Sequence, residues 1–472
     1  MSDPEPLDPE LRTEGGAPDG LIADLESGIE EKVVDALDRG DTDGARALIN
    51  DLHYTDIADL LERVDDEQRV HLVEIIRHQF DAEILPDLDD AVRDEVIELL
   101  GIDGVAAAMA ELDSDDAVEV LEELDEDDQK RVLDAIPEND RAILQEGLSY
   151  PEDSAGRLMQ RELVTAPTFW TIGNTIDYMR KNADSEDNPL PDQFYVLYVV
   201  DPSHKPVGKV ALDQVLRTKR PVRLEDVMDA DIKTVPAMAD QEDVAFLFRQ
   251  RDLVSAPVVD DTGRLVGAIT IDDIVDVIDE EHEEDIMRMG GVREHDLYDA
   301  VIDTARSRFS WLVVNLLTAI VASVVISFFD ATIEELVALA VLMPIVASMG
   351  GNAGTQTLTV AVRSIAMKEI TATNASRLIG KELMVGVFNG VVFAVLAGSI
   401  TWAWFSNPLL GMVIGLAMIV NMIVAGAAGT VIPIVLDRMD VDPAVASGVF
   451  LTTITDVVGF FVFLGLAALI LL

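Results

Sequence analysis

The sequence predicts a multidomain chain: an α-helical superhelix first, two copies of an α/β module next, and an all-α membrane domain of five helices last. Three observations predict this order: an uneven division of charge, two internal repeats in the front part, and five long apolar runs in the back part. Of the 88 Asp and Glu residues, 79 precede residue 311, as do 29 of the 34 Lys and Arg residues. Such an asymmetry indicates two physically different environments.

The front part begins with residues 1–20, which are acidic and rich in Pro and Gly. They predict a disordered tail and lack the leader of a signal peptide. From there apolar residues recur at helical spacing, which predicts a helical domain over 21–148. Within it, residues 56–76 align with residues 116–136 at an offset of 60, apolar on apolar. We therefore expect stacked helical hairpins that form a short superhelix.

Residues 151–279 alternate Val-rich strand patterns, such as 195–200 and 254–260, with helical ones such as 244–251. The two halves of this region repeat one another at two sequence offsets. A strand-rich motif recurs after 59 residues, and the segment before it, residues 159–181, recurs after 69 residues as 228–250. The motif matches residue by residue, with Val199, Val200, Asp201, Gly208 and Asp213 against Val258, Val259, Asp260, Gly267 and Asp272. We expect two modules side by side, over 151–220 and 221–279.

The back part, residues 311–472, contains apolar runs long enough to cross a bilayer core of about 30 Å. They cover residues 311–329, 336–349, 383–405, 409–436 and 444–472. Lys and Arg collect before the first run and in the loops after the second and fourth. The positive-inside rule then places the front part in the cytosol and the C-terminus outside. We expect a multi-pass protein of the cell membrane that contacts lipid.

Composition restricts what acidic clusters can mean. The formal net charge is -54, and 25 Arg stand against 9 Lys. Such a surface is typical of a halophilic, salt-adapted protein, because about 1 M salt shortens the Debye length to about 3 Å. No basic patch is present, which argues against nucleic acid as a partner. The chain has no cysteine and no HExxH, Walker, GxGxxG or Ser-His-Asp pattern, so we expect no enzyme.

Asp456 is the one acidic residue inside the five apolar runs. A carboxylate at membrane depth is costly and by default marks a functional site. Mg²⁺ dehydrates reluctantly, so carboxylate and amide oxygens in a pore suit its hydrated form. The alternative is an Asp that only hydrogen-bonds to Thr452, Thr453 or Thr455, or to a neighbouring helix.

A second polar element is the segment GGNAGTQ, residues 350–356. Its glycines allow close helix approach or a broken helix with free carbonyls. The predicted pore ligands here are Gly351, Asn352, Thr355 and Gln356. The alternative is a packing seam of small residues with amides that join helices. Three further asparagines in the apolar runs are expected to join helices only: Asn315, Asn389 and Asn421.

A third element is the acidic stretch DDIVDVIDEEHEED, residues 272–285, ahead of the membrane part. Its hard carboxylate oxygens suit Mg²⁺. Several of its acids share one face of a helix: Asp276, Glu280, Glu283 and Glu284. The alternative is a solvated acidic face, which the salt-adapted composition favours. His282 has no second histidine at metal spacing and is expected to be a bystander.

These segments resemble known families. The sequence APVVDDTGRLVGAITIDDIVDVI, residues 256–278, resembles a CBS domain, so 151–279 is similar to a tandem CBS pair. The front repeat resembles the helical N-terminal domain of MgtE magnesium transporters. The membrane part resembles the same family through LMPIVASMGGNAGTQTLTVAVR (342–363) and TTITDVVGFFVF (452–463). The resemblance covers nearly the whole chain in the family's domain order.

The resemblance implies a homodimeric Mg²⁺ channel that closes when cytosolic Mg²⁺ is high. Asp456 matches the pore-lining position of the family motif, where the carboxylates of two subunits face one pore. The stretch before the membrane corresponds to a connecting or plug helix, 280–310. The positions that match regulatory Mg²⁺ ligands are Asp115, Asp240, Glu242, Asp252, Asp273, Asp276, Glu281, Glu284 and Asp285. Glu119 stands where the family pattern has Asp, which lengthens the arm.

Two alternatives remain open. The chain could be a membrane-anchored sensor whose CBS modules bind an adenine nucleotide such as ATP, with helices that conduct nothing. It could also be a transporter of broader range, for Co²⁺ or Ni²⁺, or an exporter. Mg²⁺ uptake measured with an Asp456→Ala variant would separate the sensor from the transporters, because unchanged uptake would exclude a pore at Asp456.

Overall fold

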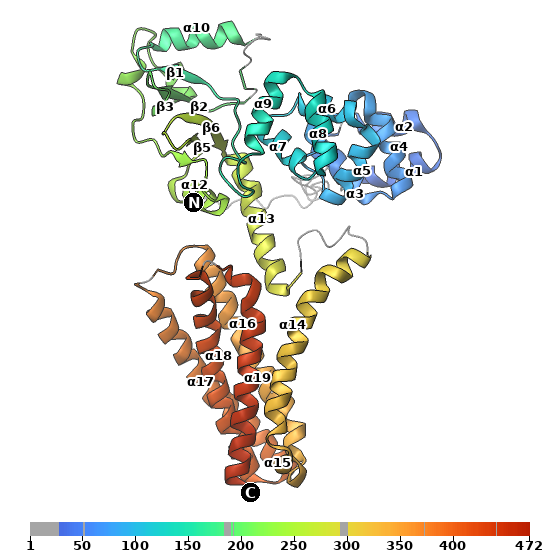
Figure 1. The fold of residues 1–472 in the computed structure, drawn as a ribbon, viewed down its shortest axis with the longest axis vertical. Helices are drawn as coiled ribbons and strands as arrows, with labels where there is room; N and C mark the ends of the chain where they lie inside the picture. The colour runs from blue at the N-terminus through green and yellow to red at the C-terminus, as the bar shows by residue number, and fades with distance from the viewer. Residues whose placement is uncertain are drawn as a thin grey trace, which may run out of the picture. The chain divides into compact units, whose positions relative to one another are not determined.

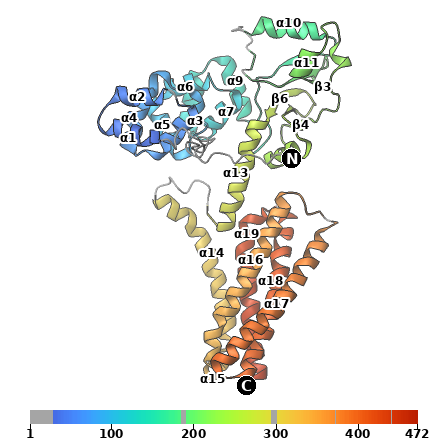
Figure 2. The same cartoon turned by 180° about the vertical axis from the view of Figure 1, so that it is seen from behind.

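The computed structural model describes residues 28–50, 52–183, 190–191, 193–292, 301–371, 373–439 and 441–472. The predicted tail over 1–20 lies outside these ranges. The chain divides into two compact units, Met1–Ile278 and Asp279–Leu472, which are taken here one at a time. Figures 1 and 2 show the elements of each unit from opposite sides.

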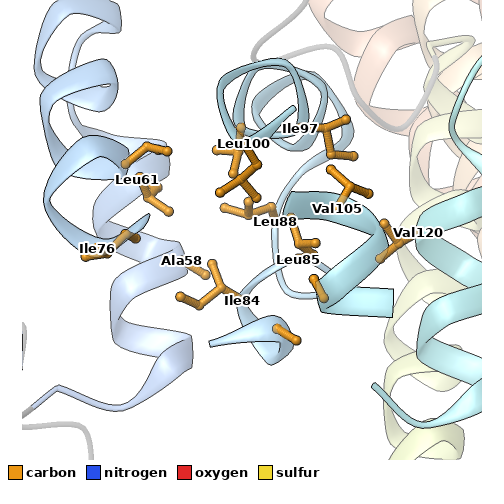
Figure 3. Packing of buried hydrophobic residues seen from close by; sticks show 14 of the residues in the cluster. Ala58, Leu61, Ile76, Ile84, Leu85, Leu88, Ile97, Leu100, Val105 and Val120 are labelled. Atoms are coloured by element: carbon orange, nitrogen blue, oxygen red, sulfur yellow. The ribbon is translucent and has the colours of Figure 1, made fainter. Parts of the chain in front are cut away.

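The first unit begins with short helices. They are α1 (Glu30–Asp38), α2 (Thr42–Ile49), α3 (Tyr54–Arg63), α4 (Asp66–Ile76), α5 (Asp90–Leu100), α6 (Ile102–Met109), α7 (Ser114–Glu122), α8 (Glu126–Ala135) and α9 (Glu138–Gly147), with 3₁₀ turns η3 (Arg77–Gln79) and η4 (Ala82–Ile84). Side chains from α3, α4, η4, α5, α6 and α7 point toward one another in a single core (Figure 3). The leucine, isoleucine, valine and alanine positions at three- and four-residue spacing supply this core.

The predicted helical repeat is confirmed, because α3–α4 and α7–α8 lie 60 residues apart. The equivalent Asp65 and Asp125 accept hydrogen bonds from backbone N–H groups in the first turn of α4 and of α8. The Arg69 Nε donates to the Leu61 carbonyl at 2.9 Å, and the equivalent Gln129 Nε2 donates to the Leu121 carbonyl at 2.8 Å. In each hairpin, a side chain of the second helix thus donates a hydrogen bond to a carbonyl near the end of the first helix.

Two three-stranded sheets follow, and they confirm the predicted α/β repeat. The first contains β1 (Thr165–Pro167), β2 (Val196–Val200) and β3 (Pro206–Ala211), and the second β4 (Val235–Pro236), β5 (Ser255–Val259) and β6 (Leu265–Thr270). The connected helices are α10 (Ile172–Asn182), α11 (Leu212–Arg217), α12 (Gln241–Arg251) and α13 (Ile271–Gly290), with the 3₁₀ turn η5 (Leu224–Asp226). Helices α10 and α12 are offset by 69 residues, as predicted.

The register of the two sheets is the same. Val199 pairs with Gly208 in the first sheet, and Val258 pairs with Gly267 in the second, each next to a bulge. The modules are also interlocked. Gln160 of the first copy bridges to Ala268 of the second sheet, and Asp229, at the equivalent place in the second copy, bridges to Lys209 of the first. The modules therefore form a CBS pair rather than two independent domains.

The second unit contains five helices long and apolar enough to cross a membrane, as predicted, within the described residues. They are α14 (Val301–Ser327), α16 (Ala338–Ala366), α17 (Ala375–Phe405), α18 (Pro408–Asp437) and α19 (Pro443–Ile470). A short helix, α15 (Asp330–Glu335), lies between α14 and α16. Helices α16 and α17 extend past their apolar runs and include charged residues that were expected in loops, Arg363, Arg377 and Lys381. Long basic side chains reach water from such helix ends.

Glycines line the contact between α17 and α18, which lie side by side in Figure 1. A methyl group at Gly398 would lie 2.8 Å from the Gly411 carbonyl oxygen, and one at Gly426 would lie 2.8 Å from that of Glu382. Gly390 of α17 and Gly415 of α18 lie between these two contacts along the helices. Each also packs against the backbone of the opposite helix. The two backbones therefore touch along most of their length, which only small residues permit.

Candidate cation sites

The segment GGNAGTQ lies within one continuous helix, α16, so the broken helix considered from the sequence is not found. Gly350 and Gly354 face the bundle interior, whereas Asn352, Thr355 and Gln356 are exposed on the other side of the helix. The Asn352 amide donates to the Ser348 carbonyl and the Thr355 hydroxyl to the Gly351 carbonyl. Their acceptor oxygens therefore remain available on one exposed stripe of α16.

Asp456 lies half-buried in α19 at the level of this stripe. Two contacts set the level: Gly354 of α16 packs against Leu451, and Gly350 and Gly459 both pack against Asn421 of α18. Asp456 lies between Leu451 and Gly459, so its turn of α19 lies opposite residues 350–354. The structure thus brings together the two membrane elements that the sequence predicted.

The threonines beside Asp456 do not hold its carboxylate. Thr452, Thr453 and Thr455 each donate their hydroxyl hydrogen to carbonyls of α19 itself. Among the described residues, no hydrogen bond or ion pair engages the Asp456 carboxylate. The alternative of an Asp that is merely hydrogen-bonded to its threonines is therefore wrong in this structure.

Asn421 joins helices, as expected from the sequence. Its side chain is 1% exposed, and its Nδ2 donates to the Val346 carbonyl at 2.9 Å. Its Oδ1 is buried without a partner among the described residues. A methyl at Gly459 would lie 2.9 Å from Asn421 Nδ2. This amide therefore spaces α16 and α19 at the level of Asp456.

Glu382 is a second buried carboxylate in the membrane unit, and the sequence reasoning missed it. It lies one residue before the apolar run 383–405, but α17 begins at Ala375 and includes it. The side chain is 7% exposed and accepts a hydrogen bond from Thr357 Oγ1 of α16 at 3.2 Å. Its closeness to the run was the available signal, since helices commonly begin before the apolar stretch that identifies them.

In the first unit, the first turns of α7 and α13 bring buried carboxylates together. Asp115 is 9% exposed, and Asp116 follows it in α7. Burial raises the pKa of Asp115 well above its usual range, and the negative charge of Asp273 on α13 raises it further. Burial, Glu83 and Asp273 raise the pKa of Asp116 to about 8.

Asp273 itself has its pKa raised to about 6 by burial and by its acidic neighbours, although it accepts hydrogen bonds from the Thr270 N–H and hydroxyl. These carboxylates cannot all be ionised so close together unless a cation lies between them. Without a cation, some of them stay protonated. The structure thus places the charge of Asp273 close enough to raise the pKa of both Asp115 and Asp116.

Other predicted regulatory residues in this unit are placed less favourably. Glu119 is ion-paired with Arg93, whose Nη2 lies 3.3 Å from its Oε1. Asp276 is exposed but close enough to raise the pKa of Asp87, a residue not predicted. Asp87 and Asp116 were missed because the charges of Asp276 and Asp273 act on them from a segment far away in the sequence, which spacing within their own segments cannot reveal.

Asp240 and Asp252 lie at opposite ends of α12. Asp240 caps its start by accepting from the Glu242 N–H at 3.0 Å, and Asp252 ends it in a left-handed conformation with φ of 51°. The 11 residues of α12 between them span about 16 Å at 1.5 Å per residue. Asp240 and Asp252 therefore cannot share one ion within a single chain.

In the second unit, the end of α13 carries Glu281, Glu284 and Asp285. Arg288 forms an ion pair with Glu284, and its Nη1 lies 2.8 Å from Asp442 Oδ2. Burial and Asp442 raise the pKa of Asp285, and His282 opposes that shift. Asp442 also caps the start of α19. Arg288 and Asp442 were not predicted, because they are 154 residues apart in the chain.

Among the described residues, no three Asp, Glu or His side chains are already arranged as a metal site. The donor set is nonetheless chemically suited to a hard divalent cation, because it consists of carboxylate, amide and hydroxyl oxygens without a thiol.

The chain matches family models described as "Divalent cation transporter" over residues 343–466, "MgtE intracellular N domain" over 52–153 and "CBS domain" over 224–280. The magnesium transporter MgtE of Bacillus subtilis is 34% identical over 361 residues, 76% of this chain and 79% of that protein. That of Thermus thermophilus is 33% identical over 335 residues, 70% and 73% of the two chains.

A solved structure, the cytosolic domain of the Mg²⁺ channel MgtE in complex with ATP, is 28% identical with a TM-score of 0.48. The similarity covers 52% of this chain and 99% of that one.

Proposed function

The chain belongs to the MgtE family of magnesium transporters, and on that premise we propose that it is a homodimeric channel for Mg²⁺ uptake, closed by cytosolic Mg²⁺. One observation carries the proposal: an unpartnered carboxylate, Asp456, lies at the level of the exposed oxygens of Asn352, Thr355 and Gln356. In a dimer, two such carboxylates facing one pore would repel unless a cation lay between them.

The proposed direction is inward. With the first unit in the cytosol and the C-terminus outside, an inside-negative potential favours entry of a divalent cation by about 4.6 kcal/mol per 100 mV. Asn352, Thr355, Gln356 and the Gly351 region would accept hydrogen bonds from the water shell of the ion. A hydrated Mg²⁺ suits such a path, because Mg²⁺ loses water reluctantly.

The proposed gate depends on acids that repel in the absence of a cation. Asp115 and Asp273 join α7 to α13, so the binding of Mg²⁺ there would stabilise this contact and hold α13 in place. At low cytosolic Mg²⁺ no cation bridges these acids: those that ionise repel one another, those with raised pKa values keep their protons, and the contact loosens. Glu281, Glu284 and Asp285, and Asp240, Glu242 and Asp252, are further candidate regulatory ligands. An adenine nucleotide at the CBS pair rests on the family resemblance alone.

Flux through the purified chain in liposomes, with a Mg²⁺-sensitive dye inside, tests both parts. Asp456→Asn should lower Mg²⁺ influx at least about tenfold, the scale of one charged ligand lost. Asp437→Asn, an exposed carboxylate at the end of α18, is the matched control. Unchanged flux in Asp456→Asn would exclude the pore assignment, and no flux in the unmodified chain would favour the membrane-anchored sensor.

The gate is tested in the same assay with Asp115→Asn combined with Asp273→Asn. The double variant should keep conducting at Mg²⁺ levels on the cytosolic face that close the unmodified channel, because the coordinating charges are gone. Asp103→Asn, an exposed position on α6, serves as control. Normal closure in the double variant would refute the role of these acids.

A further inference from the structure

Glu382 is the buried carboxylate of the membrane unit for which the proposed pore and gate have no use. Within the five spans the acidic residues are Asp456, Asp437 at the end of α18, and Glu382. Burying a carboxylate at 7% exposure is costly, so a sequence keeps one only where its interactions matter. Its interactions therefore indicate what it does.

The carboxylate is joined to α16. Thr357, itself 7% exposed, donates from Oγ1 to Glu382 Oε2 at 3.2 Å. Lys381 Nζ lies 3.7 Å from the other oxygen, Oε1, and its side chain is 68% exposed, so this charge pair is weak. The Thr357 hydroxyl is thus the main fixed partner of the carboxylate.

The surroundings make this junction rigid. Gly426 of α18 packs directly on the Glu382 carbonyl. Gly429, one turn later, packs on the Gly354 carbonyl and on the Thr357 side chain. Three helices, α16, α17 and α18, therefore meet around the Thr357–Glu382 hydrogen bond, with backbone contacts that leave little room for adjustment.

Thr357 follows directly after the exposed stripe of α16. Successive residues of a helix are about 100° apart, so fixing Thr357 toward α17 fixes the direction of Thr355 and Gln356. Rotation of α16 by one residue's angle would turn the exposed Asn352, Thr355 and Gln356 away from the side where they now lie. The Thr357–Glu382 bond opposes that rotation.

We propose that Glu382 is a positioning residue for the ion path: through Thr357 it fixes the rotation of α16 that presents Asn352, Thr355 and Gln356 to the ion. Glu382 is assigned no contact with the ion, since its side chain is buried and its oxygens face Thr357 and Lys381. This inference rests on the proposed transport function and adds to it a residue that determines how well the hydrated ion is recognised.

The test compares near-isosteric changes at Thr357 in the full-length protein in liposomes. Thr357→Val removes the hydroxyl and should lower Mg²⁺ flux about tenfold, the scale of a hydrogen bond to a charged acceptor. It should also raise the half-saturating Mg²⁺ concentration and lower the Mg²⁺ to Ca²⁺ flux ratio. Thr357→Ser restores the hydroxyl and should restore all three quantities to within about twofold.

Glu382→Ala should have the same effects as Thr357→Val, and the two changes together should be no worse than either alone, because both remove one bond. Thr430→Val is the matched control: Thr430 is a fully buried threonine of α18 whose hydroxyl bonds only to the Gly426 carbonyl of its own helix. Thermal midpoints in detergent identify any variant that fails to fold, and Thr357→Val against Thr357→Ser decides in that case.

The proposal is overturned if Thr357→Val behaves like Thr357→Ser, or if the effects of Glu382→Ala and Thr357→Val add. A loss of flux with unchanged half-saturation and unchanged ion preference would also overturn it, because this pattern indicates a stability role only. These results differ from failure of the transport function itself, in which the unmodified chain conducts no Mg²⁺ and Asp456→Asn changes nothing.

Discussion

The chemistry of the candidate gate depends on burial of a few side chains among many that are solvated. Asp115, Asp116 and Asp273 have raised pKa values because burial removes them from water and because other acidic side chains lie near each of them. Most of the other acidic side chains in the described part of the chain are exposed. Burial, rather than number, therefore separates candidate ligands from background charge.

These pKa values predict how stability depends on pH. The folded chain holds protons on Asp116 up to about pH 8 and on Asp273 up to about pH 6, whereas the ordinary value is 3.8. Unfolding therefore releases protons in this window, and the free energy of unfolding falls as pH rises through it. The thermal midpoint of the first unit, measured in chelator, should fall from about pH 5 to about pH 8.5.

Added Mg²⁺ should flatten that fall, because it replaces protons as the counter-charge and binds more tightly as they leave. Asp116→Asn should flatten it without Mg²⁺, and Asp103→Asn should not. An equal slope in the unmodified chain and in Asp116→Asn would show that these carboxylates do not titrate in this range.

At the scale of elements, the chain is built from repeated units whose local interactions repeat with them. Helices α3–α4 and α7–α8 share a cap and an inward hydrogen bond at an offset of 60, and the two sheets share their register and bulge at an offset of 59. A buried arginine adds to the first hairpin. Arg69 also donates to the Val64 carbonyl and forms an ion pair with Glu95 of α5.

Arg69→Met should destabilise this hairpin by about 3 kcal/mol, because it leaves buried carbonyls and Glu95 without their partner. Gln129→Met should cost only about 1 kcal/mol, since a single neutral hydrogen bond is lost. Hydrogen–deuterium exchange of α3–α4 and α7–α8 amides in the full chain measures both, and Arg131→Met, an exposed ion pair with Asp128, is the control. Equal protection in Arg69→Met and the unmodified chain would contradict the assignment.

Patterns within one segment predicted the elements well, and contacts between distant segments were predicted less well. Periodicity and repeats identified the superhelix, the paired modules and five spans, because each depends on neighbouring residues. The resemblance named Asp115 and Asp273 as separate candidate ligands, without pairing them. Glu382, Asp116 and Arg288 were missed, because their roles arise from packing against elements far away in sequence. Helix ends were also missed, since α16 and α17 continue beyond their apolar runs into water.

At the scale of the whole molecule, charge is concentrated outside the membrane unit. The front 310 residues carry 79 acidic and 29 basic residues, so long-range repulsion acts on the first unit in dilute buffer. The Debye length falls from about 10 Å at 0.1 M salt to about 3 Å at 1 M, which removes most of that repulsion. Direct coordination of Mg²⁺ by carboxylates acts at contact distance and is screened much less.

Raising KCl from about 0.1 M to about 2 M should therefore raise the thermal midpoint of the first unit while closure by Mg²⁺ persists. Both are measured on the full chain, by thermal scanning in detergent and by flux in liposomes with balanced salt. Loss of closure at high KCl would mean that gating depends on long-range repulsion rather than on coordination.

The glycine contact between α17 and α18 also bears on how the protein is made. These helices are adjacent in the chain and joined only through Ser406 and Asn407, so they can meet without closing a long loop. The pair can therefore form as soon as both helices have left the ribosome, before all of α19 has emerged from it. It would then offer α19, which carries Asp456, a finished surface on which to dock.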